Sequence, residues 1–357
     1  MMEENNFDLA IIGAGIIGTC VAWYARKHYP AWRIALVDKS EVGSGASFYS
    51  ASLDIPFGHT PLRYKFSKRS RSLYAELRNE LPELPIKDLN FYGVVNEDSA
   101  CHVLQQFTEP GASLCPEIIP SLLKEYPFLN LSGHTTIISG LNASQALTNN
   151  VANILAKNFA STSNSLIAEH IKVKDVSYRE GLYDIRTQDD IHFYSTRIMQ
   201  ATGPWITENL GSNIRIKRSA RIKKIVAFHI LKQPEATDPL FYFFDDDAFL
   251  MPKYEEGYWL FSFKCDHWDV VPEKSKLSID EADRIKAQNI LKKYAPQFAS
   301  LCLGGRVFCD AYTADGDPVV EEVKENYIIA GAGAGSGYRL APAIAEEVLK
   351  FFQQKAS

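Results

Sequence analysis

The sequence lacks several features that would define a functional class outright. Its six cysteines include no C-x-x-C pair, and no histidine cluster stands beside them at the spacing of a zinc site. Lys and Arg number 38 against 43 Asp and Glu, so a net charge of −5 provides no general attraction to nucleic acid. We therefore expect no metal site, no nucleic-acid partner and reduced thiols, as in a cytoplasmic protein.

The sequence also lacks an apolar run long enough to cross a membrane. The run from Leu9 to Ala25 carries no charge, but three glycines interrupt it and it is shorter than the ~20 residues of a spanning helix. Glu3, Glu4 and Asp8 precede it, where a signal peptide would have a basic leader. We expect no membrane span. The length of 357 residues and the 46% hydrophobic content fit a globular chain of about two domains.

The hydrophobic pattern predicts a βαβ start followed by a β-rich middle region. Strands are expected at residues 7–12, 33–37, 171–176, 183–186, 192–200, 214–230, 240–250, 258–264 and 327–330, with a hairpin turn at 245–247. Helices are expected at residues 16–28, 61–81, 142–160, 278–294 and 342–352. Asn142 is the expected N-cap of the third helix, and Ser278 with Glu281 forms an S-x-x-E capping box for the fourth.

The most informative motif is G-x-G-x-x-G, formed by Gly13, Gly15 and Gly18 directly after the first strand. The three glycines allow a tight turn, close backbone approach to a pyrophosphate, and close packing of helix on strand. Asp38 ends the next strand about 20 residues further on, where a carboxylate accepts hydrogen bonds from a ribose diol. This combination predicts a dinucleotide site, and the spacing alone leaves NAD and FAD open.

A second glycine-rich run, Gly331 to Gly337, also lies between a strand and a helix. Too little chain follows it for another complete nucleotide domain. We expect its backbone N–H groups to meet the other end of the same cofactor.

Four stretches of the chain carry a family resemblance. They are DLAIIGAGIIGTCVAWYA with LVDKS, then GSGASFYSASLD, then QATGPWITENLG, and finally TADGDPVV followed by NYIIAGAGAGSGYRLAPAIAEEV. Their order and separation resemble the superfamily of FAD-dependent oxidoreductases that contains D-amino-acid oxidase, glycine oxidase and sarcosine oxidase. The resemblance covers nearly the whole chain, although residues 61–140 and 216–303 match only in general pattern.

The resemblance implies an α/β fold (α+β overall) with a Rossmann-like domain around a parallel central sheet and an antiparallel β-rich substrate domain. It assigns residues 1–60, 141–215 and 304–357 to the FAD-binding domain and residues 61–140 and 216–303 to the substrate-binding domain. The cofactor-binding residues that it implies are Gly13, Ala14, Gly15, Ile16, Ile17, Gly18, Asp38, Lys39, Ala46, Ser47, Val173, Ala201, Thr202, Gly203, Trp205, Gly335, Ser336, Gly337, Tyr338, Arg339 and Leu340.

The resemblance also implies three residues with roles toward the substrate or oxygen. Arg339 matches a substrate-carboxylate ligand, and Lys264 matches a lysine near the flavin N5 that favours oxygen reduction. Asp310 stands where glycine oxidase has a carboxylate-binding arginine, so glycine is a doubtful substrate and a cationic group on the substrate is one alternative. An outward-facing Asp310 is the other alternative.

One departure from the family concerns the attachment of FAD. Members with covalent FAD have a cysteine seven residues before the aspartate that matches Asp315, and this chain has Phe308 there, with Cys309 displaced by one residue. Because neighbouring strand residues point to opposite faces, Cys309 is expected to face away from the flavin. We therefore expect non-covalent FAD.

The implied activity is oxidation of the C–N bond of an amine or amino acid by hydride transfer to flavin N5, with oxygen as acceptor and hydrogen peroxide as product. Alternatives are a dehydrogenase with a quinone or carrier acceptor, a flavoenzyme that modifies a peptide or biosynthetic intermediate, and a flavin-binding assembly protein without turnover. Six basic residues within Arg215–Lys224 are interpreted as a solvent-facing strand, or alternatively as a docking patch for an acidic partner protein.

Overall fold

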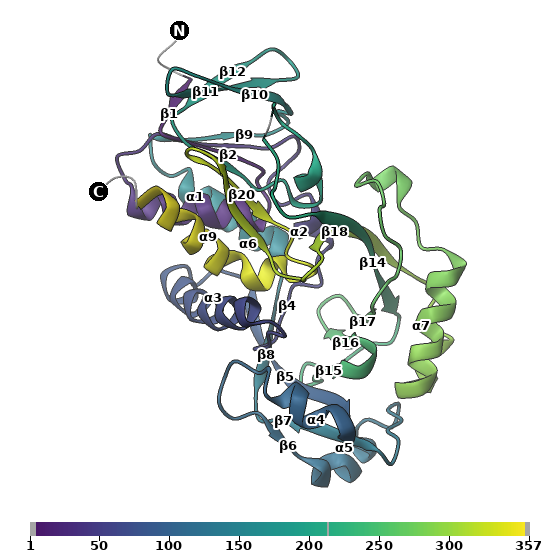
Figure 1. Ribbon diagram of the computed structural model, residues 1–357. Helices are drawn as coiled ribbons and strands as arrows, with labels where there is room; N and C mark the ends of the chain where they lie inside the picture. Colours follow the sequence, from purple (N-terminus) through teal and green to yellow (C-terminus); the bar gives the residue numbers. More distant parts are fainter. Residues whose placement is uncertain (1–4, 213, 354–357) are drawn as a thin grey trace.

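A computed structural model describes residues 5–212 and 214–353 of the chain. Two sheet systems dominate it, and β14 (Ala220–Ile230) and β18 (Gly304–Thr313) run from one to the other (Figure 1). The first system is a parallel sheet covered on both faces, and the second is a large, mainly antiparallel sheet. This is the predicted fold class.

The six-stranded sheet is the centre of the first system. Its order is β19 (Val319–Lys324), β20 (Tyr327–Gly331), β13 (Ile198–Gln200), β2 (Leu9–Ile12), β3 (Ile34–Val37) and β9 (Ser165–Ala168). All neighbours pair in parallel except β19 with β20. Every residue of β2 and β3 is buried, which agrees with their uninterrupted apolar sequences, because a parallel strand is covered on both faces.

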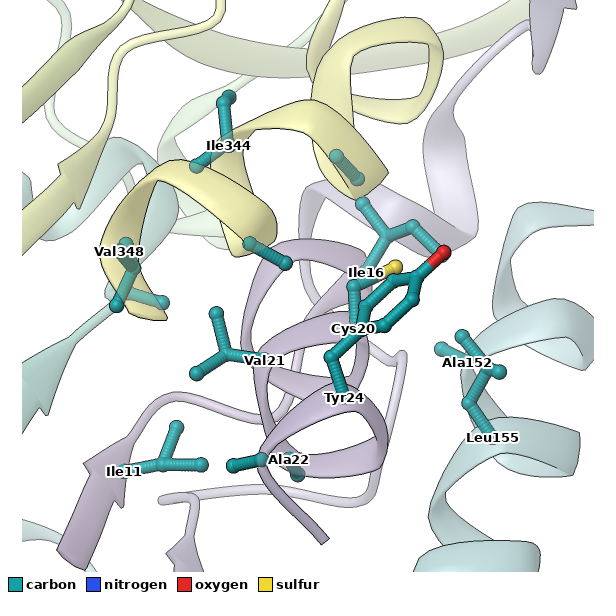
Figure 2. Packing of buried hydrophobic residues seen from close by; sticks show 14 of the residues in the cluster. Ile11, Ile16, Cys20, Val21, Ala22, Tyr24, Ala152, Leu155, Ile344 and Val348 are labelled. Atoms are coloured by element: carbon teal, nitrogen blue, oxygen red, sulfur yellow. The ribbon is translucent and has the colours of Figure 1, made fainter. Parts of the chain in front are cut away.

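Helices cover one face of this sheet. They are α1 (Ile16–His28), α6 (Thr148–Phe159) and α9 (Gly337–Gln353), and α3 (Pro61–Glu80) packs against α9. Figure 2 shows α1 packed between α6 and α9. Val21 points toward Ile344 and Val348 of α9, and Ile16 and Tyr24 lie beside α6. The apolar face of α1, buried against two helices, holds the glycine turn before it in place.

A small sheet covers the other face. It contains β1 (Asn6–Phe7), β12 (His192–Ser195), β11 (Leu182–Thr187) and β10 (Val173–Arg179). Alternate residues of β11, Tyr183 and Ile185, pack with Ile12 and Val37 of the parallel sheet.

The second system is a ten-stranded sheet. Its path is β18, β14, β17 (Tyr258–Ser262), β16 (Ala248–Lys253), β15 (Leu240–Phe243), β5 (Ile86–Asn96), β7 (Thr135–Ser139) and β6 (Ser113–Leu114), with β4 (Leu53–Asp54) and β8 (Asn142–Ala146) joined beside β5. Residues 244–247 turn the chain between β15 and β16, with Asp247 left-handed at φ 44°, so the predicted hairpin turn is confirmed.

The two faces of the ten-stranded sheet have different neighbours. Val226, Phe228 and Ile230 of β14 pack with α7 (Glu281–Tyr294) and α8 (Pro296–Ala299), whereas Ala227 packs on the opposite face. The remaining helices are α2 (Ala46–Tyr49), α4 (Glu97–Leu104), α5 (Ile119–Glu125) and the 3₁₀ turns Pro116–Ile118, Gly203–Thr207, Phe244–Asp246 and Lys274–Lys276.

Two expected helix starts are wrong. Residues 142–146 form β8 instead of the first turn of a helix, because they pair with β4 and β5, and α6 begins at Thr148. The capping box of α7 lies two residues after the predicted one. The Asp280 carboxylate accepts from the Asp283 N–H and the Asp283 carboxylate accepts from the Asp280 N–H, each at 2.9 Å.

Two further boundaries differ because tertiary contacts extend or divide an element. The expected strand at 192–200 is two strands in different sheets, β12 and β13. The last helix begins at Gly337 and continues through Pro342, which has no N–H for the Tyr338 carbonyl. The Tyr74 hydroxyl donates to that carbonyl at 2.7 Å, and Ser70 Oγ accepts from the Ala343 N–H at 3.1 Å, so α3 replaces the missing bonds.

The domain boundaries remain predictions. Helix α3, placed in the predicted substrate domain, shares a hydrophobic cluster with α1, α6 and α9. All six cysteines are free thiols. Among the described residues, no helix has the length and apolar character that crossing a membrane requires.

Candidate functional site

A cavity of about 1100 Å³ lies where the two sheet systems meet. The carboxyl ends of β2, β3, β13 and β20 open into it through Ile12, Val37, Ala201 and Gly331. Strands β14, β16, β17 and β18 form the opposite wall. Ligands of open α/β sheets bind at the carboxyl edge of the strands, so the cavity has the expected position for a nucleotide.

The first glycine motif divides into packing and lining positions. A Cβ on Gly13, where φ is +106°, would lie 2.3 Å from the Ala201 carbonyl oxygen, and a Cβ on Gly18 would lie 1.8 Å from the Gly13 oxygen. These two glycines allow β2, β13 and α1 to pack. Gly15 lines the cavity, and the nearest atom to a Cβ there is Ser47 Oγ at 3.3 Å. Bare backbone at a helix N-terminus is the donor set that suits a pyrophosphate.

Asp38 lies at the end of β3 and lines the cavity. Its carboxylate accepts from the Ala14 N–H at 2.6 Å and from the Ser40 N–H at 2.8 Å. Burial raises the pKa of Asp38, and these two hydrogen bonds oppose the rise. A carboxylate has about four lone-pair positions, so capacity remains for a ribose hydroxyl. Beside it, Lys39 Nζ stands 3.3 Å from the centre of the Trp205 ring.

The second glycine run provides another stretch of bare backbone at the N-terminus of α9. Gly337 lines the cavity, and a Cβ added there would have no atom within 4 Å. Ser336 Oγ accepts from Arg63 Nη1 at 3.1 Å and from Arg339 Nη2 at 3.2 Å, and Arg63 also donates to the Gly333 oxygen at 2.9 Å. Arg63, which the sequence did not single out, therefore holds this loop in place from α3.

The cavity gathers most of the predicted cofactor residues. Those that line it are Gly13, Gly15, Ile16, Ile17, Asp38, Lys39, Ala46, Ser47, Val173, Ala201, Thr202, Gly203, Trp205, Gly335, Ser336, Gly337, Tyr338 and Arg339. The other three are Ala14, Gly18 and Leu340. Ala14 and Leu340 are buried in the helical core, and Gly18 packs against Gly13.

The three residues with predicted roles toward substrate or oxygen all line the cavity. The Arg339 guanidinium donates to the Phe57 oxygen at 3.0 Å and to Ser336, and its Nε has no partner among the described residues. Asp310 faces the cavity, so the outward-facing alternative is wrong. Its carboxylate accepts from the Gly335 N–H at 2.8 Å, and burial raises its pKa. Lys264 is exposed at the end of β17.

The structure adds residues to this end of the cavity that sequence reasoning missed. Tyr242 donates to the Asp247 carboxylate at 2.6 Å, and both line the cavity. Lys223 is 5% exposed, with Nζ 4.3 Å from the Tyr312 ring centre, and it lies opposite Asp310 on the neighbouring strand. Burial lowers the pKa of Lys223. Asp247 was seen only as part of a turn.

The basic segment Arg215–Lys224 is a solvent face at Arg215, Lys217 and Arg221, which are exposed, but this interpretation is wrong for the buried Lys223 and Lys224. Arg218 pairs with Glu321 at 2.9 Å and Arg221 with Asp269. Lys223 and Lys224 are both buried, on opposite faces of β14, because the side chains of a strand alternate.

The buried Lys224 is the centre of a separate, partly exposed cluster behind the cavity wall. Its Nζ donates to Asp280 at 2.9 Å and to Asp283, and lies 3.3 Å from His267 Nδ1. Cys265, His267 and Asp283 have possible ligand atoms within 4.8 Å of one another. The lysine ammonium already supplies the cation that these acids need.

Phe308 and Cys309 lie on opposite faces of β18. Phe308 stacks on Tyr49 with ring centres 6.2 Å apart, whereas Cys309 packs with Ile206 and Ala311 in the core of the first system. Both residues line the cavity, but only 5% of Cys309 is exposed. Burial raises the pKa of Cys309 to about 12, so the thiolate that would attack a flavin is scarce at neutral pH.

The site geometry thus fits an extended dinucleotide, with bare backbone at two helix N-termini and a ribose-facing carboxylate between the sheets. A model of the family described as FAD dependent oxidoreductase matches residues 8–350. The chain belongs to this family, and FAD is its cofactor.

Solved structures share the fold over almost the whole chain. Glycine oxidase from Geobacillus kaustophilus is 18% identical at a TM-score of 0.80, with 98% of this chain and 95% of that chain covered. L-proline dehydrogenase from P. horikoshii is 17% identical at a TM-score of 0.80, with 98% of this chain and 94% of that chain covered. L-alpha-glycerophosphate oxidase from Mycoplasma pneumoniae, solved with FAD bound, is 16% identical at a TM-score of 0.77, with 98% of this chain and 95% of that chain covered. Comparison with curated proteins finds no match.

Proposed function

We propose that this FAD-dependent oxidoreductase oxidises the C–N bond of an amino acid or a related carboxylate-bearing amine, with oxygen as the electron acceptor. The observation that carries the proposal is the Arg339 guanidinium, which faces the cavity and keeps donor capacity beyond its two hydrogen bonds to Phe57 and Ser336. A planar guanidinium is suited to bidentate recognition of a carboxylate.

The residues around Arg339 have complementary roles in this proposal. Asp247, hydrogen-bonded by Tyr242, lies at the same end of the cavity and accepts the proton that a substrate ammonium must lose before its nitrogen lone pair assists oxidation. Burial raises the pKa of Tyr242, which keeps its hydroxyl protonated as a donor. Bound FAD supplies the two-electron acceptor.

The oxygen half-reaction requires positive charge near the reduced cofactor. Lys264 lies at the cavity rim, and Lys223 is buried in the same wall. We assign Lys264 the role of favouring superoxide formation, on the family resemblance, with Lys223 as a second cation close to it.

The test is anaerobic mixing of the holoenzyme with a panel of amines and amino acids, monitored by bleaching of the flavin absorbance. At least one carboxylate-bearing amine should bleach the flavin, and admission of air should then restore the colour and release one peroxide per substrate consumed. Bleaching without peroxide release would assign a quinone or carrier acceptor instead. Bleaching by hydroxy compounds alone, with no amine active, would refute C–N oxidation.

A further inference from the structure

A second group of charged side chains lies on the cavity-side face of the ten-stranded sheet, beyond the cavity wall. Ala227 of β14 and Phe308 of β18 line the cavity, and the next residues on that face are His229 and Arg306. Arg306 pairs with Ala227 across the two strands. Two residues along a strand span about 7 Å, so this group begins one such step from the cavity.

The same face continues across β17 and β16 to Lys253. Tyr258 of β17 is directly opposite Lys253 of β16 in the register. The His229 and Tyr258 rings stack with centres 4.1 Å apart. Arg306, His229, Tyr258 and Lys253 therefore form a row across four adjacent strands, and we call this group the basic row. In Figure 1, its strands are the upper right part of the large sheet, above β5, β7 and β6.

The basic row has unused hydrogen-bonding groups. His229 Nε2 and Arg306 Nε are buried and have no partner among the described residues. Lys253 is only 5% exposed, and its ammonium forms no hydrogen bond or ion pair within the described part of the chain. One contact anchors the arginine, from Nη2 to the Ser50 oxygen at 3.1 Å. Buried donors without acceptors are costly, and native proteins satisfy nearly all of them.

Two glutamates near the basic row attract its cations, but neither forms an ion pair with it within the described residues. Glu255 and Glu256 lie in the turn between β16 and β17, and Glu255 is already paired with Lys87. Burial lowers the pKa of Lys253 to about 8, with Glu256 and Glu255 opposing the decrease and Arg306 adding to it. Burial, with the repulsion of both cations, lowers the pKa of His229 to about 4. At neutral pH the row therefore presents two cations and one neutral imidazole.

We infer that the basic row binds a small oxyanion, a carboxylate or phosphate group, between Arg306 and Lys253. A guanidinium, an ammonium and an imidazole N–H together supply donors for several oxygen atoms of one anion. The bound anion accepts hydrogen bonds from the unpartnered nitrogens of His229 and Arg306 and compensates the positive charge of Lys253 and Arg306. The site is distinct from the dinucleotide cavity, whose lining includes none of its three basic residues.

The test uses the holoenzyme with excess FAD, so that phosphate cannot enter the pyrophosphate site. Sodium phosphate, sodium acetate and sodium chloride are titrated at matched ionic strength while the thermal midpoint is recorded, and ³¹P NMR line width reports phosphate binding directly. Phosphate or acetate should raise the midpoint more than chloride, since a ligand that binds the native state stabilises it. The anion with the larger effect identifies the ligand as a phosphate or a carboxylate.

Two substitutions and a matched control locate the site. Lys253→Met and Arg306→Met should each weaken the apparent affinity about tenfold or more, because each removes a buried charge partner. In sodium chloride alone, Lys253→Met should also raise the thermal unfolding midpoint, because it removes a buried charge that has no ion-pair partner among the described residues. Lys157→Met, at an exposed position on α6, should keep the wild-type response.

Two results would overturn the inference. One is an equal oxyanion response in wild type and both Met variants, which places binding elsewhere. The other is a response no larger than that to chloride, with unchanged ³¹P line width, up to tens of millimolar. If a Met variant does not fold, Lys253→Gln, titrated in the same way, decides the question.

Discussion

Replacement of Arg339 by alanine tests the substrate end of the cavity most directly. The guanidinium makes two hydrogen bonds, to the Phe57 carbonyl and to Ser336 Oγ, and its Nε has no partner in the described part of the chain. Burial lowers the pKa of Arg339. The nearby carboxylate of Asp54 opposes that lowering and keeps the arginine charged. A charged guanidinium with unused N–H donors in a ligand cavity can bind one further anionic group.

The size of the effect follows from the loss of a buried charge pair. Removing one partner of such a pair costs about 3–5 kcal/mol, which is a fall in kcat/KM of roughly two to three and a half powers of ten. The two hydrogen bonds to the protein contribute about 0.5–1.5 kcal/mol each to stability, so the thermal midpoint should fall as well. Arg339→Lys keeps the charge but loses the planar fork, and it should recover part of the activity.

The assay separates binding of the carboxylate from general damage. kcat/KM is measured for the amino acid that bleaches the flavin and for its decarboxylated amine, in wild type and in Arg339→Ala, with flavin content checked for each preparation. The loss should appear for the amino acid and be nearly absent for the amine. An equal loss for both compounds would refute the carboxylate role, and an unchanged kcat/KM for the amino acid would do so too.

Three further predictions concern the glycine motif, the cofactor linkage and a buried lysine. Gly18→Ala places a methyl group 1.8 Å from the Gly13 oxygen, so it should destabilise the fold by about 1–3 kcal/mol or more and yield protein without flavin. Gly304→Ala, at an exposed position outside the cavity where a Cβ meets no atom within 4 Å, should match the wild-type melting curve; circular dichroism and the flavin absorbance report both. Acid precipitation should release the yellow colour into the supernatant because burial raises the pKa of the Cys309 thiol to about 12 and leaves little thiolate to attack the flavin, and colour retained in the pellet would contradict non-covalent FAD. Lys253 has its pKa lowered from 10.5 to about 8, so between these values the unfolded chain holds a proton that the folded chain lacks, and stability rises with pH. Urea unfolding should therefore show Lys253→Met more stable than wild type below pH 8, with the gap closing toward pH 10.5; a gap that does not change with pH would argue against the buried charge.

The sequence by itself determined the nucleotide end of this protein, because its signals are local. Gly13, Gly15 and Gly18 between an apolar strand and a helix, with Asp38 at the next strand end, impose the turn, the helix N-terminus and the carboxylate within a short stretch of chain. The structure confirms this βαβ start and the hairpin turn before Asp247.

Only the tertiary structure decided what lies at the other end of the cavity. Lys223 and Lys224 are adjacent in a segment of basic residues, yet pairing of β14 with β18 directs one toward Asp310 and the other toward Asp280 and the buried Asp283. Arg63 reaches the loop before α9 across 273 residues of sequence to Ser336. Such contacts depend on strand register and on the packing of distant elements, which local residue patterns do not encode.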